Sequence, residues 1–458
     1  MPLEIASENE VQSYPTPCEF VTGAAGTGKT FTIKGRQEDD PRYAILTGST
    51  GIAAVNMNAV TINSLLQFFD TDSLRDAFLM GGLVGRINKL RREGYRNVVL
   101  DEVSMFSGES LDILVSAFDA ANSSEDSAVM NLPPIGLILV GDFCQLPPIK
   151  AKFAFESLSW HRFQEKTTRL EKNWRQGDGM FLEALNAARA GRGFACVDLL
   201  KNCGVEFHDT LDAEFDGTTI VAKNDKVDQY NTYRLGLVNG RAFHLVSNRW
   251  AFEKTPSEWK NIPDKQTFKI GAYVMILANG FEPGMPGERP RLIYANGDCG
   301  HIESIDGSKV GIRLARNDQK VYVDEILRSV ETKHRPGHLA PSVTLDDEGN
   351  AVEQDGKDVP NAEGYNNQVH WNPTKKRYVL AQIAYYPLRL AYASTVHKTQ
   401  GLSLDRVQVD FREGFMAMPG MGYVALSRCR TAKGLRIVGN KALVASRVKV
   451  DKKVEGWL

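Results

Sequence analysis

Residues 23–30 read GAAGTGKT, which is a complete Gly-x-x-x-x-Gly-Lys-Thr phosphate loop. Glycines allow the backbone to curl so that its N–H groups point at a phosphate chain. In such a loop Lys29 reaches the β- and γ-phosphates and Thr30 offers its hydroxyl to Mg²⁺. An apolar, strand-like stretch precedes the loop at 18–22, and residues 31–35 can open a helix whose N-terminus favours anions. A chance glycine-rich turn seldom has both neighbours, so the sequence predicts a nucleoside triphosphate site on a strand–loop–helix unit.

The segments around this loop follow the rhythm of a parallel α/β sheet. Apolar runs are separated by helical patterns over the first part of the chain, and the same alternation begins again near 165 and resumes at 385–440. The expected strands are 43–47, 97–101, 135–140 and 218–222, and the expected helices are 61–69, 108–121 and 179–190. Residues 66–96 lie between two of the strands and are expected to form an inserted, partly helical subdomain. We therefore expect two α/β lobes in tandem.

The sequence pattern changes in the middle of the second lobe. Short strands are expected at 269–277, 298–304, 309–314 and 319–324, with Asn-Gly and Asp-Gly pairs that favour tight turns between them. This pattern predicts a small antiparallel barrel over 265–385. Within it, residues 341–375 are polar and acidic and are expected to form a long loop.

Composition sets wider bounds. The chain has 458 residues with a net charge of −1, so charge alone does not suggest a nucleic-acid partner. A basic run at 86–96 is partly hidden in that total by acidic residues at 341–365, and the simplest interpretation of both is solvated surface. The six cysteines are far apart, which argues against a zinc site or a disulfide framework and fits a reducing cytoplasm. No secretory signal or membrane-spanning run is visible, so we expect a cytoplasmic protein.

Polar residues follow two further buried strands. Residues 98–105 read VVLDEVSM, in which Asp101 can hold Mg²⁺ opposite Thr30 and Glu102 can polarise the water that attacks the γ-phosphate. Residues 136–149 read GLILVGDFCQLPPI, in which Gln145 can hydrogen-bond both phosphate and water. An Asp-Glu pair or an ordinary turn is common on its own, so the argument depends on their position after strands downstream of a phosphate loop.

Two arginines are candidates for stabilising charge on the transferred phosphoryl group. Arg175 lies in LEKNWRQGD and Arg428 in GYVALSRCR. Arginine fingers contribute roughly 10³- to 10⁵-fold in known NTPases. The alternative for any single arginine is a surface ion pair.

The ordered series GAAGTGKT, TGSTGIAAVNM, VVLDEVSM, GDFCQLPPI, NWRQGD, STVHKTQGLSLD and YVALSRCR resembles the motifs of the B-type superfamily-one DNA helicases of the Pif, RecD and Dda kind. The resemblance extends from about residue 18 to 440. It implies an α/β fold with two tandem RecA-like lobes, ATP in the cleft between them, an inserted wedge subdomain and an inserted small β-barrel. On that basis the first lobe is 1–65 and 97–165, the wedge 66–96, the second lobe 166–264 and 386–458, and the barrel 265–385.

The resemblance also implies roles for individual residues. The first lobe is expected to bind ATP and Mg²⁺ and the second to complete the site. The catalytic set is Lys29, Asp101, Glu102, Gln145, Arg175 and Arg428; the nucleotide contacts are Gly23, Gly26, Thr27, Gly28, Lys29, Thr30, Gln400 and Gly401; and the metal contacts are Thr30 and Asp101. Arg175 and Arg428 are expected from the second lobe.

Single-stranded DNA is expected to cross both lobes. The positions matching the family's contacts are Ser49, Thr50, Gly51, Thr61, Asn63, Ser64, Thr395, His397 and Lys398, and Phe143, Phe69 and Tyr95 are candidates for stacking on bases. Thr61 could equally cap a helix, and both roles could hold together. Asn63 stands where the family usually has histidine, and Met421 where glutamine is common.

The function implied is an ATP-dependent helicase that moves 5′→3′ on single-stranded DNA and unwinds duplex at junctions, in replication, repair or recombination and alongside proteins of those processes. The alternative is a related NTPase subunit that remodels DNA or RNA without unwinding. The predicted wedge and barrel favour the helicase.

Overall fold

The structure is a computed structural model that describes residues 14–457 except 51–52, 55–56, 58, 126–128, 178, 222–223, 252–254, 256–258, 260–261, 283–290, 295, 307, 333–342, 346–350, 354–369 and 373–376. Its chain divides into two compact units. The first comprises Met1–Arg192, Met418–Val424 and Val448–Leu458, and the second Gly193–Ala417 and Ala425–Arg447. No helix among the described residues is long and apolar enough to cross a membrane.

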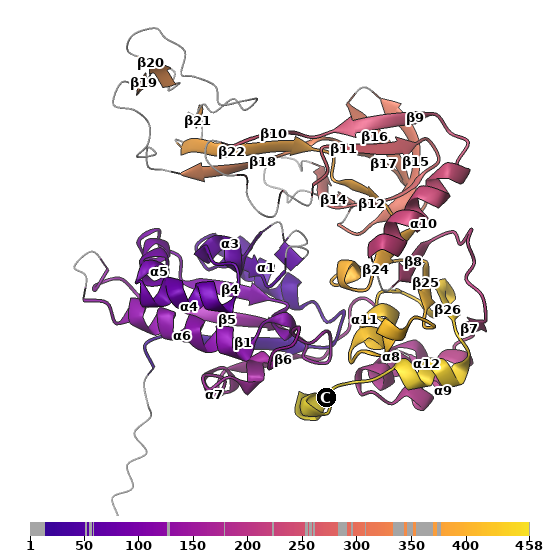
Figure 1. The fold of residues 1–458 in the computed structure, drawn as a ribbon, viewed down its shortest axis with the longest axis horizontal. Helices are drawn as coiled ribbons and strands as arrows, with labels where there is room; N and C mark the ends of the chain where they lie inside the picture. Colours follow the sequence, from indigo (N-terminus) through magenta and orange to yellow (C-terminus); the bar gives the residue numbers. More distant parts are fainter. Residues whose placement is uncertain are drawn as a thin grey trace, which may run out of the picture. The chain divides into compact units, whose positions relative to one another are not determined.

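A six-stranded parallel sheet forms the centre of the first unit (Figure 1). Its strands are β1 (Cys18–Gly23), β2 (Ile45–Gly48), β3 (Val60–Thr61), β4 (Asn97–Asp101), β5 (Gly136–Gly141) and β6 (Thr167–Leu170), in the order β3-β2-β4-β5-β1-β6. All six residues of β5 are buried, as expected for a central strand of a parallel sheet covered on both faces. Because all strands run the same way, the segments that follow β1, β4 and β5 leave the sheet at one edge.

Helices cover this sheet, and some of them begin at side-chain caps. They are α1 (Lys29–Asp39), α3 (Ile62–Leu66), α4 (Thr71–Leu79), α5 (Gly82–Arg92), α6 (Gly108–Asn122), α7 (His161–Gln164) and α8 (Met180–Arg189), with short 3-10 turns η1 (Val103–Met105), η2 (Ala154–Glu156) and η7 (Lys452–Trp457). The Ser107 hydroxyl accepts from the Ser110 amide to start α6, and Asp70 starts α4 with a capping box. The predicted insertion at 66–96 is mainly α4 and α5, which pack on each other and on α6.

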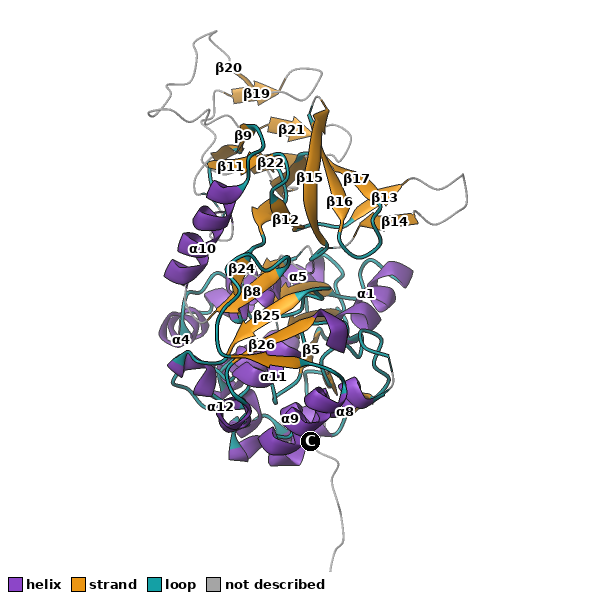
Figure 2. Cartoon of the chain, turned by 90° about the vertical axis from the view of Figure 1, so that its right-hand side faces the viewer, coloured by secondary structure: helices purple, strands orange, loops and turns teal. Residues whose placement is uncertain are grey.

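The second unit contains a parallel sheet of its own, seen nearly face-on in Figure 2. Its order is β24 (Ala393–Thr395), β8 (Thr218–Val221), β25 (Val407–Asp410), β26 (Leu435–Val438) and β7 (Glu206–His208). The helices of this unit are α9 (Gly193–Asn202), α10 (Asn224–Leu237) and α12 (Lys441–Arg447), with 3-10 turns η4 (His397–Thr399), η5 (Gly414–Ala417) and η6 (Ala432–Gly434). Helix α11 (Met421–Leu426) begins in the first unit and ends in the second. Two parallel sheets in tandem confirm the predicted α/β class.

Antiparallel strands lie between β8 and β24 in the chain. One sheet has the order β17 (Lys320–Val323), β16 (Lys309–Leu314), β15 (Cys299–Asp306), β12 (Tyr273–Ile276) and β23 (Leu388–Leu390). A second joins β10 (Asn248–Ala251), β22 (Arg377–Tyr385) and β18 (Ile326–Thr332), with β21 (His370–Asn372) on β22. The remaining pairs are β9 (Ala242–Val246) with β11 (Lys265–Lys269), β13 (Gly280–Glu282) with β14 (Arg291–Tyr294), and β19 (Val343–Leu345) with β20 (Ala351–Glu353). The predicted short strands are confirmed, whereas their closure into a barrel stays a prediction. Most of the acidic stretch 341–375 lies outside the described residues.

The predicted lobe boundary at 165/166 is wrong. Strand β6 pairs in parallel with β1, so that Phe20 lies opposite Thr167, and residues as far as Arg192 belong to the first unit. The strand that extends the first sheet is only four residues long and polar, TTRL, which gave it no apolar signature in the sequence. Residues 418–424 and 448–458 also return to the first unit.

Candidate nucleotide and DNA site

The phosphate loop leaves β1 and leads directly into α1, as the sequence predicted. Gly26 and Gly28 have φ values of 88° and 82°, a region that side chains with a Cβ rarely adopt. The Lys29 ammonium donates to the carbonyls of Gly23 at 2.8 Å and Ala24 at 3.1 Å. Burial lowers the pKa of Lys29, although Asp142, Glu102 and Asp101 act in the opposite direction. The lysine is therefore folded back over the loop where a phosphate chain would lie.

Thr30 and Asp101 come together from different elements. Thr30 lies in the first turn of α1, and Asp101 ends β4. The Thr30 hydroxyl donates to Asp101 Oδ2 at 2.7 Å. Asp101 is 5% exposed, and burial raises the pKa of its carboxyl. A hydroxyl and a carboxylate in contact are hard oxygen ligands of the kind that Mg²⁺ prefers, so these residues fit the ion that the phosphate loop implies.

Glu102 has a left-handed backbone with φ of 56°, which is uncommon for a residue with a side chain. Three hydrogen bonds hold that conformation. The Glu102 amide donates to Asp101 Oδ1 at 2.8 Å, the Ser49 hydroxyl donates to the Glu102 carbonyl at 2.7 Å, and the Ser49 amide donates to the Asp101 carbonyl at 3.0 Å. Ser49, predicted as a DNA contact, thus also buttresses the carboxylate pair.

Gln145 follows β5 at the same edge of the sheet. It is 5% exposed, and its backbone N–H donates to the Asp142 carbonyl at 3.0 Å in a tight turn. Asp142 itself is fully buried, and its carboxylate accepts from Arg189 on α8 and from the hydroxyl of Tyr423. Tyr423 and Arg189 were not predicted from the sequence, because an aromatic residue in an apolar helix and an arginine at a helix end have no local signature.

Arg175 lies beside the phosphate loop within the first unit, not in the second lobe as expected. A Cβ built on Gly26 would lie 2.8 Å from Arg175 Cβ. Its neighbour Asn173 fixes this approach: Asn173 Nδ2 donates to the Ala25 carbonyl at 2.8 Å, and Asn173 Oδ1 accepts from the Arg175 and Gln176 amides, each at 2.9 Å. The expectation failed because β6 brings the NWRQ segment back to β1.

Trp174 is a further residue near the loop that the sequence did not predict. Trp174 is 70% exposed, and a Cβ built on Gly28 would lie 3.4 Å from its ring. The Trp174 amide donates to the Gly26 carbonyl at 2.8 Å. A largely exposed indole, with the Lys172 ammonium 3.9 Å from its ring centroid, therefore lies beside the phosphate loop.

Arg428, Gln400 and Gly401 lie in the second unit. The Arg428 guanidinium is 1% exposed and donates to the carbonyls of Thr399 at 3.2 Å and Leu402 at 3.4 Å, and to the Ser427 hydroxyl at 2.8 Å. It therefore holds the loop that carries Gln400 and Gly401. Gly401 has a φ of 77° within that loop.

The predicted DNA contacts of the first unit lie near the end of β2 and at α3. The Thr50 hydroxyl accepts from the Ala53 amide at 3.2 Å, and Asn63 Nδ2 donates to the Phe69 carbonyl at 3.3 Å. The Thr61 hydroxyl accepts from the Ser64 amide at 3.1 Å and caps α3, so the capping role is confirmed. Gly51 lies outside the described residues.

The predicted contacts of the second unit follow β24. The Thr395 hydroxyl accepts from the Lys398 amide at 3.3 Å, in the turn that forms η4. Burial lowers the pKa of His397, which therefore favours its neutral form more than a free imidazole does. Burial also lowers the pKa of Lys398, with Arg389 adding to the effect.

Of the three aromatic candidates for base stacking, only Phe69 presents an open face, with 78% exposure. Phe143 is 1% exposed and belongs to an aromatic cluster with Phe155 and Trp457, with ring centroids 4.9 and 5.0 Å away. The expectation for Phe143 is therefore wrong, because the ring has no free surface. Tyr95 is half-buried, with the Arg42 guanidinium 6.0 Å from its ring centroid.

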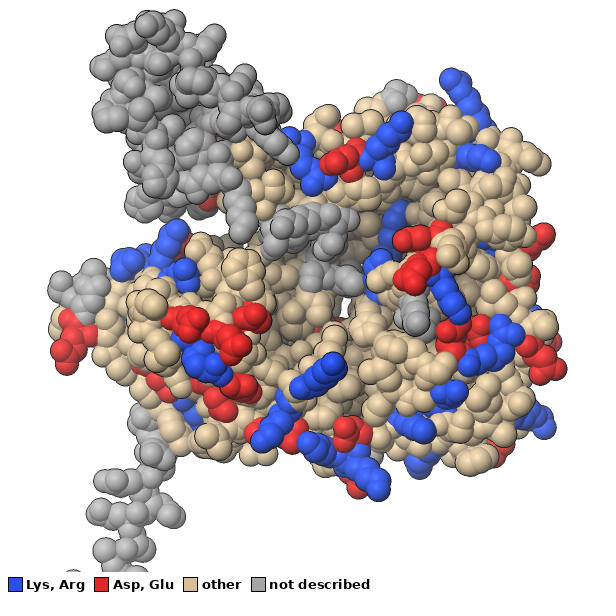
Figure 3. Space-filling view, in the orientation of Figure 1, with Lys and Arg blue, Asp and Glu red and all other residues tan. Residues whose placement is uncertain are grey.

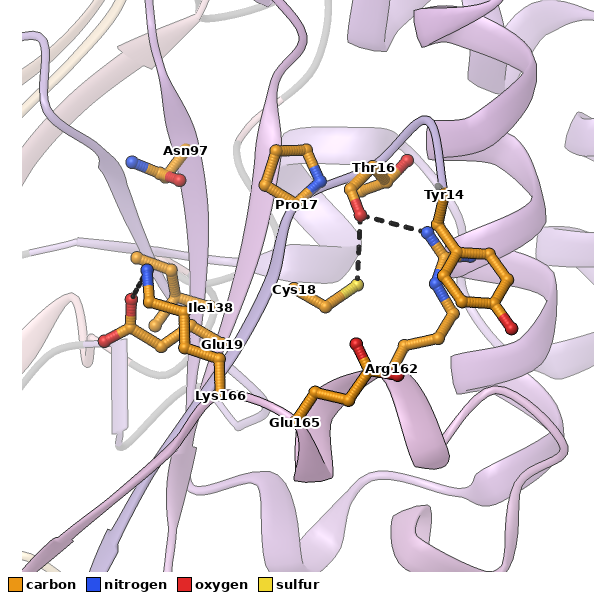
Figure 4. A pocket seen from close by; sticks show the side chains of 10 residues that line it. All are labelled: Tyr14, Thr16, Pro17, Cys18, Glu19, Asn97, Ile138, Arg162, Glu165 and Lys166. Atoms are coloured by element: carbon orange, nitrogen blue, oxygen red, sulfur yellow. Dashed lines mark hydrogen bonds and ion pairs between the residues drawn. The ribbon is translucent and has the colours of Figure 1, made fainter. Parts of the chain in front are cut away.

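A pocket of about 530 Å³ lies at the other edge of the first sheet, where β1 and β4 begin (Figure 4). Three of its charged side chains, those of Glu19, Arg162 and Lys166, are used in internal pairs. Arg162 donates to Asp119 and to the Thr16 carbonyl, and Lys166 forms an ion pair with Glu19 at 2.9 Å. Of the residues predicted for catalysis, those that follow β1, β4 and β5 lie at the opposite edge, namely Lys29, Asp101, Glu102 and Gln145.

Comparisons with known proteins agree with this arrangement. A family model described as an AAA domain matches residues 9–205. The chain is 28% identical to a protein of Bdellovibrio bacteriovorus named ATP-dependent DNA helicase Pif1, over 92% of this chain and 84% of that protein. It is 26% identical to the Pif1 of Campylobacter jejuni, over 95% and 93% of the two chains. The solved structure of Bacteroides sp Pif1 in complex with ADP-AlF4 has the same fold, with a TM-score of 0.62 and 22% identity over 94% of this chain and 92% of that one.

A phosphate loop at the carboxyl edge of a parallel sheet, with a hydroxyl–carboxylate pair beside it, defines a phosphate-loop NTPase. The matches over nearly the whole chain then agree with the resemblance found in the motifs: the chain is similar to ATP-dependent DNA helicases of the Pif1 kind.

Proposed function

We propose that this Pif1-like DNA helicase couples ATP hydrolysis to 5′→3′ movement along single-stranded DNA and unwinds duplex at single-strand/duplex junctions. The observation that carries the proposal is the convergence of Lys29, Thr30 and Asp101 at the carboxyl edge of the first sheet. This arrangement is what phosphoryl transfer needs, because positioning and charge stabilisation supply most of its catalysis.

The roles proposed for this chain's residues follow from their positions. Lys29 takes the β- and γ-phosphates in place of the loop carbonyls that it now contacts. Thr30 and Asp101 hold Mg²⁺, which neutralises phosphate charge when it is bound. Glu102 accepts a proton from the attacking water, and Gln145 contacts the γ-phosphate.

Trp174 and the two arginines complete the proposal. The exposed indole beside Gly28 is a platform on which a nucleobase can stack. Arg175, beside the phosphate loop, stabilises charge on the transferred phosphoryl group. Arg428 acts on the nucleotide through the loop of Gln400 and Gly401 that it supports.

Single-stranded DNA is proposed to bind through small polar donors that contact phosphates and do not read sequence. These are the side chains and amides at Ser49, Thr50, Gly51, Thr61, Asn63, Ser64, Thr395, His397 and Lys398. Phe69, exposed just before α4, is proposed to stack on a base.

The α4–α5 insertion is proposed as the wedge, and the antiparallel strands of 265–385 as the small barrel. Replication or repair proteins are proposed as partners.

Strand displacement on matched duplexes with a 5′ or a 3′ single-stranded tail tests this function. We expect ATP-dependent displacement of the 5′-tailed substrate only. Displacement of the 3′-tailed substrate alone contradicts the direction, and ATP hydrolysis without displacement of either favours a remodelling NTPase.

The variant Lys29→Ala is expected to abolish both hydrolysis and displacement, because the β- and γ-phosphates lose their charged contact. Lys201→Ala, which removes an exposed lysine from α9, is the matched control and should keep both activities. DNA-stimulated turnover retained by Lys29→Ala would overturn the site assignment.

A further inference from the structure

We propose that Met418–Val424 braces the nucleotide site and that Tyr423 is the residue that positions the phosphate loop. The proposal rests on the function proposed above. This segment is part of the first unit although it lies more than two hundred residues along the chain from that unit's main part. Its contacts reach two of the loops that are proposed to hold ATP.

The Tyr423 hydroxyl bridges these loops. It accepts from the Ala25 amide at 2.7 Å and donates to Asp142 Oδ2 at 3.2 Å. A tyrosine hydroxyl has one proton to donate and can accept at the same time, so both contacts are satisfied together. Tyr423 is 2% exposed and Ala25 is 6% exposed, so water cannot readily replace the hydroxyl.

Asp142 gives the hydroxyl a fixed direction. Its carboxylate accepts from Arg189 Nε at 3.1 Å and from Arg189 Nη2 at 2.9 Å, and also from the Cys144 amide at 3.2 Å. Arg189 Nη2 donates in addition to the Trp457 carbonyl at 2.9 Å. A fully buried carboxylate with a two-pronged arginine partner keeps its orientation. The proton of Tyr423 therefore points to Asp142, and its lone pair faces the phosphate loop.

Gly420 brings the same segment against the loop of Gln145. Its φ is 81°, and a Cβ built there would lie 2.3 Å from the Gln145 carbonyl oxygen. The Gly420 amide donates to the Lys449 carbonyl at 2.9 Å. Only a residue without a side chain allows this approach. The segment therefore fixes the phosphate loop through Tyr423 and the predicted γ-phosphate contact through Gly420.

The variant Tyr423→Phe removes the hydroxyl and retains the ring, so packing is preserved while the buried Ala25 amide loses its acceptor. We expect the kcat/KM for ATP to fall about 10-fold, mainly through a higher KM, because a loop that is no longer held binds phosphate less well. We also expect faster hydrogen–deuterium exchange in a peptide that covers the phosphate loop, with little change in exchange elsewhere. Tyr233→Phe, at an exposed position of α10, is the matched control.

The two readouts separate this proposal from the proposed function. If the wild-type chain hydrolyses no ATP, the proposed function fails, and exchange at the phosphate loop still tests the bridge. Unchanged exchange at the loop in Tyr423→Phe would overturn the positioning role. Faster exchange with unchanged ATP kinetics would overturn it as well, because the contact would then be structural only.

Discussion

Arg428 is 1% exposed, although arginine is seldom fully buried unless it is paired. It donates to the carbonyls of Thr399 and Leu402, which lie on either side of Gln400 and Gly401. At the scale of the residue, Arg428 thus supports the loop that carries Gln400 and Gly401, the two nucleotide contacts predicted for the second lobe.

Arg428→Ala is expected to remove ATP turnover while leaving affinity for single-stranded DNA largely intact. Loss of its hydrogen bonds leaves buried carbonyls unsatisfied, at a cost of about 1–3 kcal/mol in the free energy of unfolding. Steady-state ATPase assays, DNA titrations and thermal melts measure the three quantities. Arg406→Ala, which alters an arginine with a 51% exposed side chain, should change none of them appreciably. A collapse of DNA affinity in Arg428→Ala would instead identify Arg428 as a DNA contact.

Ionisation of Glu19 on β1 is expected to make the free energy of unfolding depend on pH. Burial opposes ionisation of its carboxyl, but hydrogen bonds from Arg36 and Lys166 outweigh burial and lower the pKa. The group therefore contributes stability above its unfolded pKa of about 4.3, and the contribution is lost as pH falls through the lowered folded value.

Glu19→Gln should accordingly reduce the melting temperature at pH 7, and the deficit should shrink as the pH falls below 4. Thermal melts across that range measure it, with Glu171→Gln at an exposed position as the control. A deficit that stays constant with pH would show that packing, and not charge, is responsible.

At the scale of elements, the basic run 86–96 contains both buried and exposed side chains. Arg91 on α5 is 4% exposed and donates to the Val129 carbonyl at 3.1 Å, the Leu132 carbonyl at 2.9 Å and Asn88 Oδ1 at 3.1 Å, with a further contact to the Ala121 carbonyl. Arg92, its neighbour, is exposed. The interpretation of the run as solvated surface is therefore wrong for Arg91, which attaches the insertion to α6 and the loop before β5.

Arg91→Ala should destabilise the first unit by about 2 kcal/mol, because hydrogen bonds from a charged group to buried carbonyls are lost. Arg92→Ala is a closely matched control and should be nearly neutral. Denaturant titration of both variants tests this difference. Equal, small effects would mean that the carbonyls find other partners.

At the scale of the whole molecule, a net charge of −1 conceals how the charges are arranged. Figure 3 shows basic and acidic side chains interspersed over the visible face, without a broad field of one sign. This face therefore offers no broad positive field that would attract DNA from a distance.

Affinity for single-stranded DNA should nevertheless fall with salt, because each phosphate contact releases counterions. For a few such contacts, we expect a loss of about 10- to 100-fold between 50 and 200 mM salt. Fluorescence anisotropy with a labelled oligonucleotide measures the slope, and oligonucleotides of different sequence should give the same value. A flat response would contradict binding through phosphates.

The sequence by itself determined the class of the fold, the phosphate loop and the carboxylate pair. GAAGTGKT and the apolar run before Asp101 are local patterns, since both the backbone conformation and the burial of a parallel strand are encoded in adjacent residues. The strands β4 and β5 and the helix α6 accordingly lie within a residue or two of their predicted positions.

Tertiary structure alone decided which residues surround that loop. A four-residue polar strand, β6, places Arg175 and Trp174 in the first unit, and residues 418–424 return there with Tyr423. Phe143 is buried among aromatic rings, and Arg428 among carbonyls. These outcomes depend on contacts between residues far apart in the chain, whose pairing no local pattern records.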